Sequence, residues 1–354
     1  MRLAVAVSGG ADSLLSLGLL ARKGHDVIAL HAHFLPPDAV QQELAASIAA
    51  QCAVLGVPFQ AVDLSQAFRE RIIEPFIAAY AQGLTPNPCA ACNRLMKFGL
   101  LLDAAHERGA SHLATGHFAR LEQTGDGPAL YRGDDPSRDQ SYFLSLVPRE
   151  ALGQVVFPLA RRRKADNAAA LAELGLAPPL PRESREVCFV PGDDYRAFLE
   201  QSGHPLSGPG PIVLGDGRRV GTHQGLWRHT IGQRKGLGVA YAEPLYVLAK
   251  DARANALRVG TKSELSATVC HTGPANLLTT PDTWPAQVGV QTCYRMRPRP
   301  ATVRLDTSGG LCIHCVEPVS RPTPGQLTTL SDASGRILAG AVIVDTDATA
   351  PERA

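Results

Sequence analysis

The stretch LAVAVSGGADSLLSLGLLARKG, Leu3–Gly24, decides how the fold begins. Five apolar residues, Leu3–Val7, predict a buried strand, and the apolar pattern after Ser13 predicts a helix ending at Gly24. Glycines between a buried strand and a helix let the backbone approach a ligand, and the helix N-terminus adds partial positive charge. We therefore expect the turn Ser8–Ser13 to bind phosphate.

The sequence of this turn also indicates which phosphate group of a nucleotide it is suited to bind. It has no Gly-Lys-Ser/Thr sequence, so it is not a loop built for transfer of a γ-phosphate. It suits holding pyrophosphate while the α-phosphorus of ATP is attacked. Asp12 is expected to cap the helix or to help hold Mg²⁺ with the phosphates. An ordinary strand–helix turn, with Asp12 or a serine as N-cap, is the alternative.

Composition limits the class of protein. The chain has 354 residues, room for two or three domains, with 45% hydrophobic and 19% charged residues. The net charge of +2 argues against non-specific wrapping of nucleic acid but allows a local basic groove. The sequence has neither a signal peptide nor an apolar run of about 20 residues, so we expect a cytoplasmic protein with no membrane contact. Eight cysteines there are not expected to form a disulfide framework.

Strand-like and helix-like segments alternate through residues 1–160. The predicted strands are 3–7, 26–34, 59–64 and 112–118, and the predicted helices are 13–24, 39–56, 68–83 and 94–109. This alternation predicts an α/β fold with a doubly wound parallel sheet. From about residue 204, dense Gly and Pro with alternating Val, Thr and Leu predict short strands. We expect a catalytic domain with a helical extension, a small β-rich central domain and a C-terminal β-barrel, at 1–204, 205–278 and 279–354.

The loop Ser8–Ser13 resembles the pyrophosphate loop of ATP-pyrophosphatase-type enzymes, which adenylate a carbonyl oxygen and release pyrophosphate. Six further motifs follow: GLTPNPCAACNRLMKF (83–98), LATGHFARL (113–121), SRDQSYFLSLV (137–147), RESREVCFVPGDDYRAFL (182–199), GTHQGLWRHTIGQRKGLG (221–238) and YVLAKDARANALRVG (246–260). In this order they resemble the tRNA-specific 2-thiouridylase family, over roughly residues 3–345. The resemblance implies an adenine nucleotide alpha hydrolase-like N-terminal fold.

The resemblance also implies an activity, the ATP-dependent 2-thiolation of the wobble uridine (position 34) of tRNA. The C2 oxygen is adenylated, and a cysteine persulfide supplies the sulfur. This agrees with elementary chemistry, because a carbonyl oxygen leaves poorly until it is adenylated and a second thiol is needed to break the S–S bond. The partners implied are tRNA, through its anticodon arm, and an upstream persulfide donor protein. We expect a monomer.

Two cysteines match the family's reactive pair. Cys92 corresponds to the nucleophile and Cys188 to the persulfide carrier, and the two can be left in a transient disulfide. Cys92 is expected to precede a helix containing Arg94 and Lys97, and therefore to have a lowered pKa. Some relatives have Asp where this chain has Cys89, so the role of a general base does not carry over.

Three alternatives stay open. Cys89, Cys92 and Cys188 could ligate a [4Fe–4S] cluster with one open iron, as related tRNA thiolases are thought to do. The chain could instead be a pyrophosphate-loop ligase for a small molecule, which would need no paired cysteines. It could also be a tRNA-binding or metal-binding protein without catalysis. Pyrophosphate release that depends on tRNA excludes the last two, because a binding protein releases none and a small-molecule ligase releases it without tRNA.

The resemblance also implies which residues bind ATP and which contact tRNA. ATP is expected to contact Ala6, Val7, Ser8, Gly9, Gly10, Ala11, Asp12, Ser13, Ala32 and Gly116. Contact with tRNA, or its specificity, is expected of His117, Arg138, Asp139, Gln140, Arg234, Lys235, Tyr294, Arg295 and Gln326. The target base must leave its stack to reach a deep ATP site, so base flipping is expected.

Two C-terminal segments carry their own expectations. CYRMRPRP, 293–300, is expected to be a strand on which Arg295 and the next two alternate arginines share one face, with Tyr294 free to stack on a base. LCIHCVEP, 311–318, is also expected to be one strand, so its two cysteines point to opposite faces and are structural rather than zinc ligands.

Overall fold

The N-terminal part is a parallel sheet, as its alternating pattern predicts. The computed structural model describes residues 2–180 and 187–345. The sheet strands are β1 (Arg2–Ala6), β2 (Asp26–His33), β3 (Phe59–Asp63), β4 (His112–Ala114) and β7 (Val155–Val156). Their order is β3-β2-β1-β4-β7, with every pairing parallel. The strand order reverses between β1 and β4, the place where open α/β sheets bind ligands.

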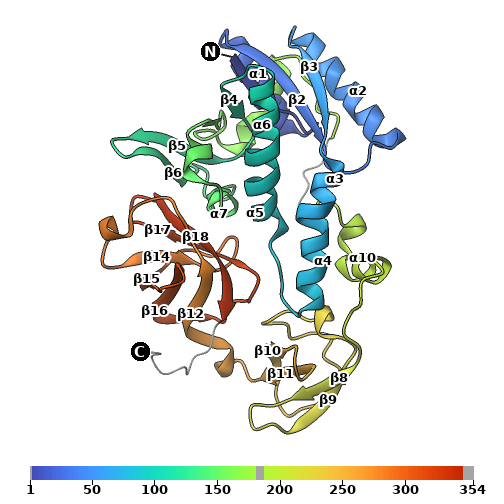
Figure 1. Ribbon diagram of the computed structural model, residues 1–354, viewed down its shortest axis with the longest axis vertical. Coiled ribbons are helices and arrows are strands. Elements are labelled where there is room, and N and C mark those ends of the chain that lie inside the picture. The colour runs from blue at the N-terminus through green and yellow to red at the C-terminus, as the bar shows by residue number, and fades with distance from the viewer. Residues whose placement is uncertain (1, 181–186, 346–354) are drawn as a thin grey trace.

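Helices cover both faces of this sheet (Figure 1). They are α1 (Ala11–Arg22), α2 (Ala39–Val54), α6 (Leu101–Glu107) and α9 (Asn167–Glu173), whereas α3 (Ser65–Phe68), α4 (Glu74–Ala81) and α5 (Pro88–Cys92) extend away from the sheet. Two π-helical segments, Arg69–Ile73 and Asn93–Leu100, join α3 to α4 and α5 to α6. Leu3 and Val5 pack in the core with α1, whereas Ala4 packs in the core with α6. Burial on both faces explains why β1 is an unbroken apolar run.

Smaller elements connect the sheet to the rest of the chain. The hairpin β5 (Ala119–Thr124) and β6 (Gly127–Arg132) precedes α7 (Ser141–Leu144) and α8 (Arg149–Leu152). Helix α10 (Tyr195–Gln201) follows the segment that carries Cys188. Among the described residues, no helix is long and apolar enough to cross a membrane.

The central part is a four-stranded sheet in the order β10-β11-β8-β9. Its strands are β8 (Gly210–Val213), β9 (Arg219–His223), β10 (Tyr246–Asp251) and β11 (Ala256–Gly260). Its core is separate and small, built around Ile212, Val247 and Leu257. This sheet lies at the lower end of Figure 1, where α4 points toward it.

The C-terminal part is a closed antiparallel barrel of six strands, which confirms the predicted barrel. The strands are β12 (Ser266–Pro274), β14 (Val288–Gln291), β15 (Arg299–Leu305), β16 (Gly310–Ser320), β17 (Leu327–Ser331) and β18 (Ile337–Asp345), and β13 (Asn276–Leu277) pairs with β18 outside the ring. Pairing of β12 with both β16 and β18 closes the barrel. Our division at 278/279 assigned β12 to the central domain, whereas its hydrogen bonds place it in the barrel.

The second Cys-x-x-Cys lies on one strand, as expected. Cys315 points into the barrel core with Ile313, and Cys312 lies on the other face of β16 beside His314. The expectation for 293–300 was wrong. Val290 pairs with Arg299, so the residues between β14 and β15 are the hairpin connection and not a strand. Pro298 reinforces this, because it has no N–H to give to a ladder.

Candidate active site

The turn after β1 is held by its own serines. Ser13 Oγ accepts a hydrogen bond from Ser8 N (3.1 Å) and donates one to Gly10 O (2.9 Å). Gly9 has φ +83°, a conformation that favours glycine. Gly10 is the N-cap of α1 and no side chain caps the helix, which rules out the ordinary capped turn. The first N–H groups of α1 are therefore left to meet a ligand.

A cavity of about 230 Å³ opens over this turn, between the ends of β1, β2 and β4. Seven of the ten predicted ATP contacts line it, namely Ala6, Val7, Ser8, Asp12, Ser13, Ala32 and Gly116. Gly9, Gly10 and Ala11 belong to the turn but are not part of the lining. The structure thus brings together residues that are more than 100 positions apart in the sequence.

Gly116 is glycine because the loop packs directly against it. A Cβ at this position would lie 2.8 Å from the carbonyl carbon of Asp12 and 2.9 Å from Ser13 N. Both atoms are backbone, so no side-chain movement relieves the overlap. The end of β4 therefore supports the phosphate loop from behind.

Asp12 does not cap α1. Its carboxylate accepts hydrogen bonds from Lys164 Nζ (2.6 and 2.7 Å) and from Asn167 Nδ2 (3.0 Å). The Lys164 side chain is largely buried, and its Nζ lies 5.8 Å from the centre of the Phe118 ring. Lys164 and Asn167 were not among the predicted site residues, because no local pattern links them to a loop that lies 152 positions before Lys164 in the sequence.

His117 is a buried, neutral wall residue of the cavity. Lys97 Nζ lies 3.5 Å from His117 Nε2, and His117 Nδ1 lies 2.7 Å from Thr115 Oγ1. Because an ammonium can only donate, Nε2 is the acceptor and Nδ1 carries the proton, which it donates to Thr115. Burial, reinforced by Lys97, holds the pKa of His117 well below its usual value. A flipped base could reach His117 only inside the cavity.

Cys89 and Cys92 both lie within a helix, which corrects the expected position of Cys92. Asn87 Oδ1 accepts from Ala90 N, and Pro88 occupies the first helical turn, so α5 starts six residues before Arg94. Cys92 is therefore not at a helix N-terminus, and its pKa is not lowered. Burial raises the pKa of Cys92 to about 12.

The structure brings the distant cysteine pair together. Cys92 belongs to the same apolar cluster as Val187 and Phe189, the two neighbours of Cys188. The two thiols interact electrostatically, and Lys97 is the cation that opposes the rise in pKa of both and of Cys89. Lys97 also lines the nucleotide cavity. Residues 182–186 of the Cys188 motif lie outside the described residues.

The three thiols do not form a metal site. Within residues 2–180 and 187–345, no three His, Cys, Asp or Glu side chains are grouped closely enough to hold a metal ion. All described cysteines, including Cys89, Cys92 and Cys188, are free thiols. The cluster alternative is therefore not supported.

The Arg-Asp-Gln segment supports the cavity from the side. Gln140 lines it, and its Oε1 accepts from Phe118 N (3.0 Å). Asp139 Oδ1 accepts from Gly133 N and Ser141 N, which fixes the start of α7. Arg138 is half-buried beside them.

Two C-terminal residues predicted to contact tRNA lie in the hairpin between β14 and β15. The Tyr294 ring is 4.6 Å from the Phe143 ring, and the Arg295 guanidinium lies 5.3 Å from the Tyr294 ring centre. Arg295 has φ +67°. Asn93, next to Cys92, donates from Nδ2 to Phe143 O (3.1 Å). Phe143 therefore connects this hairpin to Asn93, the residue that follows α5 and its cysteines.

Gln326 joins the barrel to the segment that leads into α5. Its Nε2 donates to Thr85 O (2.9 Å), and Thr85 N donates to Pro324 O (3.0 Å). Lys250 Nζ reaches the same segment from the central sheet, at 3.4 Å from Thr85 Oγ1. All three parts of the chain therefore meet at Thr85, four residues before Cys89.

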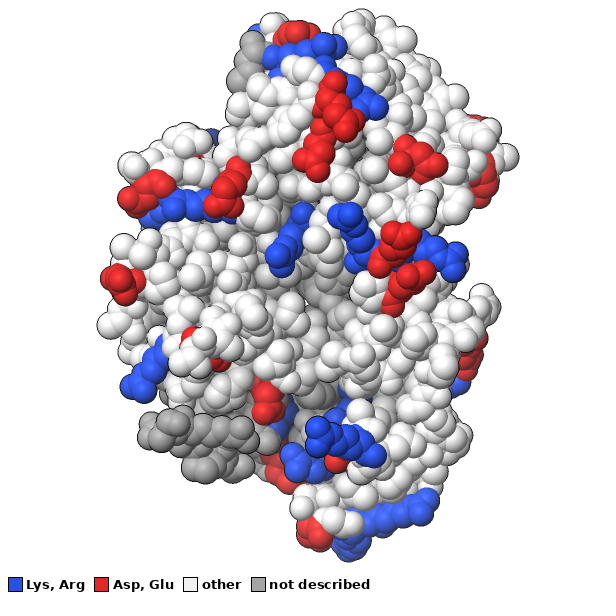
Figure 2. Space-filling model, in the orientation of Figure 1, with Lys and Arg blue, Asp and Glu red and all other residues white. Residues whose placement is uncertain are grey.

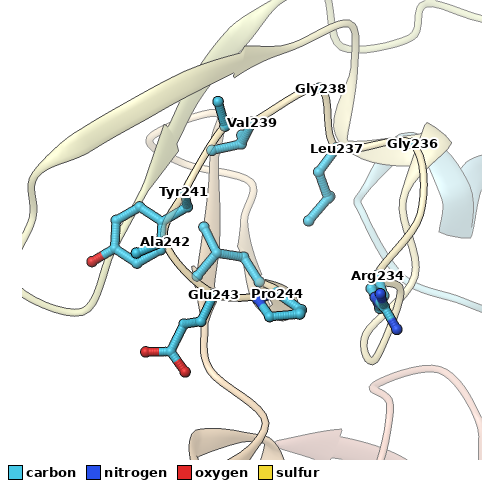
Figure 3. A pocket seen from close by; sticks show the side chains of 11 residues that line it. Arg234, Gly236, Leu237, Gly238, Val239, Tyr241, Ala242, Glu243 and Pro244 are labelled. Atoms are coloured by element: carbon cyan, nitrogen blue, oxygen red, sulfur yellow. The ribbon is translucent and has the colours of Figure 1, made fainter.

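Arg234 and Lys235 are exposed on a loop of the central part. Arg234 borders a hollow of about 620 Å³ that shares no lining residue with the nucleotide cavity. Figure 3 shows Tyr241 and Glu243 on one side of this hollow and Arg234 on the other. Lys and Arg side chains lie at the upper and lower ends of the depression between the three parts of the molecule, with Asp and Glu side chains beside them (Figure 2). The basic side chains offer local contacts to phosphate groups.

The fold and the site define a class: an α/β protein that holds a nucleotide at a glycine-rich loop and presents paired thiols beside it. Residues 1–192 match the family model described as tRNA methyl transferase HUP domain, and residues 196–261 match the tRNA methyl transferase PRC-barrel domain.

Curated relatives extend the match to the whole chain. A tRNA-specific 2-thiouridylase MnmA of Nitratidesulfovibrio vulgaris (strain Miyazaki F) is 53% identical over 97% of this chain and 99% of its own length. Proteins of the same name from Oleidesulfovibrio alaskensis and Lawsonia intracellularis are 51% and 45% identical, over 97% and 98% of this chain and 99% of theirs. The chain belongs to the tRNA-specific 2-thiouridylase family, which confirms the resemblance.

Proposed function

We propose that this protein is an ATP-dependent tRNA-uridine 2-sulfurtransferase that thiolates the wobble uridine, position 34. The observation that carries the proposal is the position of Lys97. It lines the nucleotide cavity and contacts His117. Its positive charge also opposes the rise in pKa that burial causes at the thiols of Cys89, Cys92 and Cys188. Adenylation and sulfur transfer need these two sites next to each other.

In the first step the uridine C2 oxygen attacks the α-phosphorus of ATP, and pyrophosphate leaves. The turn Ser8–Ser13 and the free N–H groups of α1 hold the pyrophosphate. Mg²⁺, when bound with ATP, would screen the phosphate charge, and the Ser8 and Ser13 hydroxyls are the oxygen ligands the loop offers it, because the Asp12 carboxylate is already paired with Lys164 and Asn167. Lys164 neutralises the negative charge of Asp12 next to the phosphate-binding turn.

In the second step sulfur replaces the adenylated oxygen. Cys188 carries a persulfide, and the Cys92 thiolate attacks the Cys188 Sγ. The S–S bond breaks, a Cys92–Cys188 disulfide forms, and the sulfane sulfur is reduced to sulfide, which adds to C2 as AMP leaves. The alternative order, in which the terminal persulfide sulfur adds to C2 before Cys92 breaks the S–S bond, gives the same products. A thiol reductant must then reduce the disulfide.

The arrangement of these residues also suggests how the tRNA substrate binds. The hairpin with Tyr294 and Arg295, together with Arg234 and Lys235, is proposed to hold the anticodon arm while the flipped uridine enters the cavity. We further propose a cytoplasmic monomer that receives its sulfur from a persulfide donor protein. The [4Fe–4S] alternative is not favoured, because the three thiols form no ligand group among the described residues.

The test is sulfur incorporation into unmodified tRNA that bears a wobble uridine, with ATP, Mg²⁺ and a persulfide donor, in air and with an iron chelator. We expect thiolation by the wild type and by Cys312→Ser, a matched control on the barrel. Cys92→Ser and Cys188→Ser should abolish thiolation but keep tRNA-dependent pyrophosphate release. Pyrophosphate release without tRNA would indicate a small-molecule ligase, and activity that requires anaerobic preparation and bound iron would indicate the cluster.

A further inference from the structure

An unbroken row of aromatic rings leads from the nucleotide cavity to the neighbour of Cys188. Phe34 lines the cavity and stacks on Phe68, with ring centres 5.0 Å apart and planes 20° apart. Phe68 in turn meets Phe189 edge-on at 5.7 Å. Phe189 follows Cys188 directly in the chain. Three rings therefore span the two halves of the active site.

We propose that Phe34, Phe68 and Phe189 are positioning residues that couple occupancy of the nucleotide cavity to the placement of the Cys188 thiol. The proposal deepens the proposed function, because it concerns how the sulfur carrier of that same site is aligned with the bound nucleotide.

The cavity end of the row is built to sense a planar base. Leu30, Ala32 and Phe34 alternate along β2 and its continuation, and all three line the cavity. An alternating set lies on one face of a strand. The Phe34 ring is half-buried in the cavity wall, so we expect the adenine of ATP to displace it on entry.

Phe68, in the middle of the row, is packed too tightly to move without moving its neighbours. Phe68 is 1% exposed, between Phe34 and Phe189. Protein interiors are packed as densely as organic crystals, so a buried ring moves only if its neighbours move. A new orientation of Phe34 must therefore be accommodated at Phe68 and then at Phe189.

The far end of the row controls Cys188 through the backbone. Phe189 is buried among Phe68, Phe76 and Phe198, with ring centres 5.1 to 5.7 Å away. Cys188 itself is exposed. Because Phe189 is a buried residue directly next to an exposed thiol, a shift of Phe189 is converted into a shift of the Cys188 thiol.

The test follows the rate at which iodoacetamide alkylates Cys188, measured on the peptide by mass spectrometry, with and without saturating ATP and Mg²⁺. No tRNA or sulfur donor is present, so the result is independent of thiolation. Cys312 on the barrel is the internal reference. In the wild type we expect ATP to change the Cys188 rate at least threefold and to leave the Cys312 rate unchanged.

Three variants complete the test. Phe34→Leu and Phe68→Leu should reduce the effect of ATP on Cys188 to less than 1.5-fold, at ATP concentrations shown by calorimetry to saturate each variant. Phe198→Leu, which removes a ring from the far side of Phe189, should retain the effect. Because the Phe34 ring is only half-buried, Phe34→Leu is expected to fold, and it tests the proposal even if Phe68→Leu does not fold. An unchanged Cys188 rate in the wild type, or a full ATP effect in Phe34→Leu, overturns the proposal, because the first denies coupling and the second means that ATP covers Cys188 directly.

Discussion

Lys164 Nζ lies 2.6 Å from one carboxylate oxygen of Asp12 and 2.7 Å from the other. The contact joins the first turn of α1 to the segment that precedes α9, across 152 positions of sequence. Asn167 adds a hydrogen bond to the same carboxylate. The phosphate loop is therefore neutralised at Asp12 before any nucleotide arrives.

The first prediction concerns this neutralisation. In Lys164→Met the Asp12 carboxylate loses its cation and repels the polyphosphate, so the Kd for ATP should rise about tenfold or more, which corresponds to about 1.4 kcal/mol. Lys164→Arg should keep most of the affinity. Calorimetric titration with ATP and Mg²⁺ measures this. Lys23→Met, at the exposed far end of α1, is the control for loss of a charge, and equal affinities of Lys164→Met and this control would refute the role.

The second prediction concerns Gly116. In Gly116→Ala the new Cβ meets the backbone of Asp12 and Ser13 at 2.8 and 2.9 Å. Overpacking of this kind costs about 1–3 kcal/mol, and here the strain falls on the phosphate loop. We expect a lower Tm and weaker binding of ATP. Gly125→Ala is the matched control, because nothing lies within 4 Å of a Cβ at that hairpin turn; it should keep the wild-type Tm and Kd.

The third prediction is a pH dependence of Cys92. Burial raises its pKa to about 12, and only the thiolate is nucleophilic. Its alkylation rate should therefore increase about tenfold per pH unit from pH 7 to 10 without levelling off. Since Lys97 opposes the rise in pKa, Lys97→Met should slow alkylation of Cys92 at every pH in this range.

Arg94→Met is the control for Lys97→Met, because Arg94 is exposed on the same helical segment. Peptide-level alkylation kinetics measure both variants. A rate that levels off below pH 9 would mean that the thiol ionises far more easily than its burial implies.

The parallel sheet and the phosphate loop could be predicted from local sequence, because strand–helix alternation and a glycine-rich turn are local patterns. The position of Cys92 could not, since Asn87 and Pro88 begin the helix earlier than the basic residues that marked its predicted start. Lys164 illustrates the general limit: its role depends on a tertiary contact with Asp12. No pattern within a window of 10 to 20 residues records such a contact.

The β-rich half shows the same limit at the level of strands. Alternating residues predicted a barrel, but β12 was assigned to the wrong part because its partners, β16 and β18, lie about 40 to 80 residues later. The hairpin with Tyr294 was taken for a strand because its alternating arginines imitate period two. Gln326, predicted to contact tRNA, also donates to Thr85 O, a contact between distant segments that no local pattern indicates.

The last prediction concerns Lys250, the half-buried lysine where the three parts of the chain meet. Its Nζ donates to His229 O at 2.9 Å and reaches Leu84 O at 3.5 Å. Burial lowers the pKa of Lys250 from 10.5 to about 8. Between these two values the unfolded chain holds a proton that the folded chain has released. The contribution of Lys250 to the free energy of unfolding should therefore increase with pH in this window.

Lys250→Met removes this proton release. The difference in free energy of unfolding, wild type minus Lys250→Met, should rise by at most about 1.4 kcal/mol per pH unit between pH 8 and 10.5, and should be flat between pH 6 and 7. Denaturant titrations at pH 6, 7, 8 and 9.5 measure it, and Lys262→Met, an exposed lysine of the same region, should show no such slope relative to wild type. Parallel pH profiles of the wild type and Lys250→Met would mean that Lys250 stays protonated, and that the junction before Cys89 holds a full positive charge throughout this range.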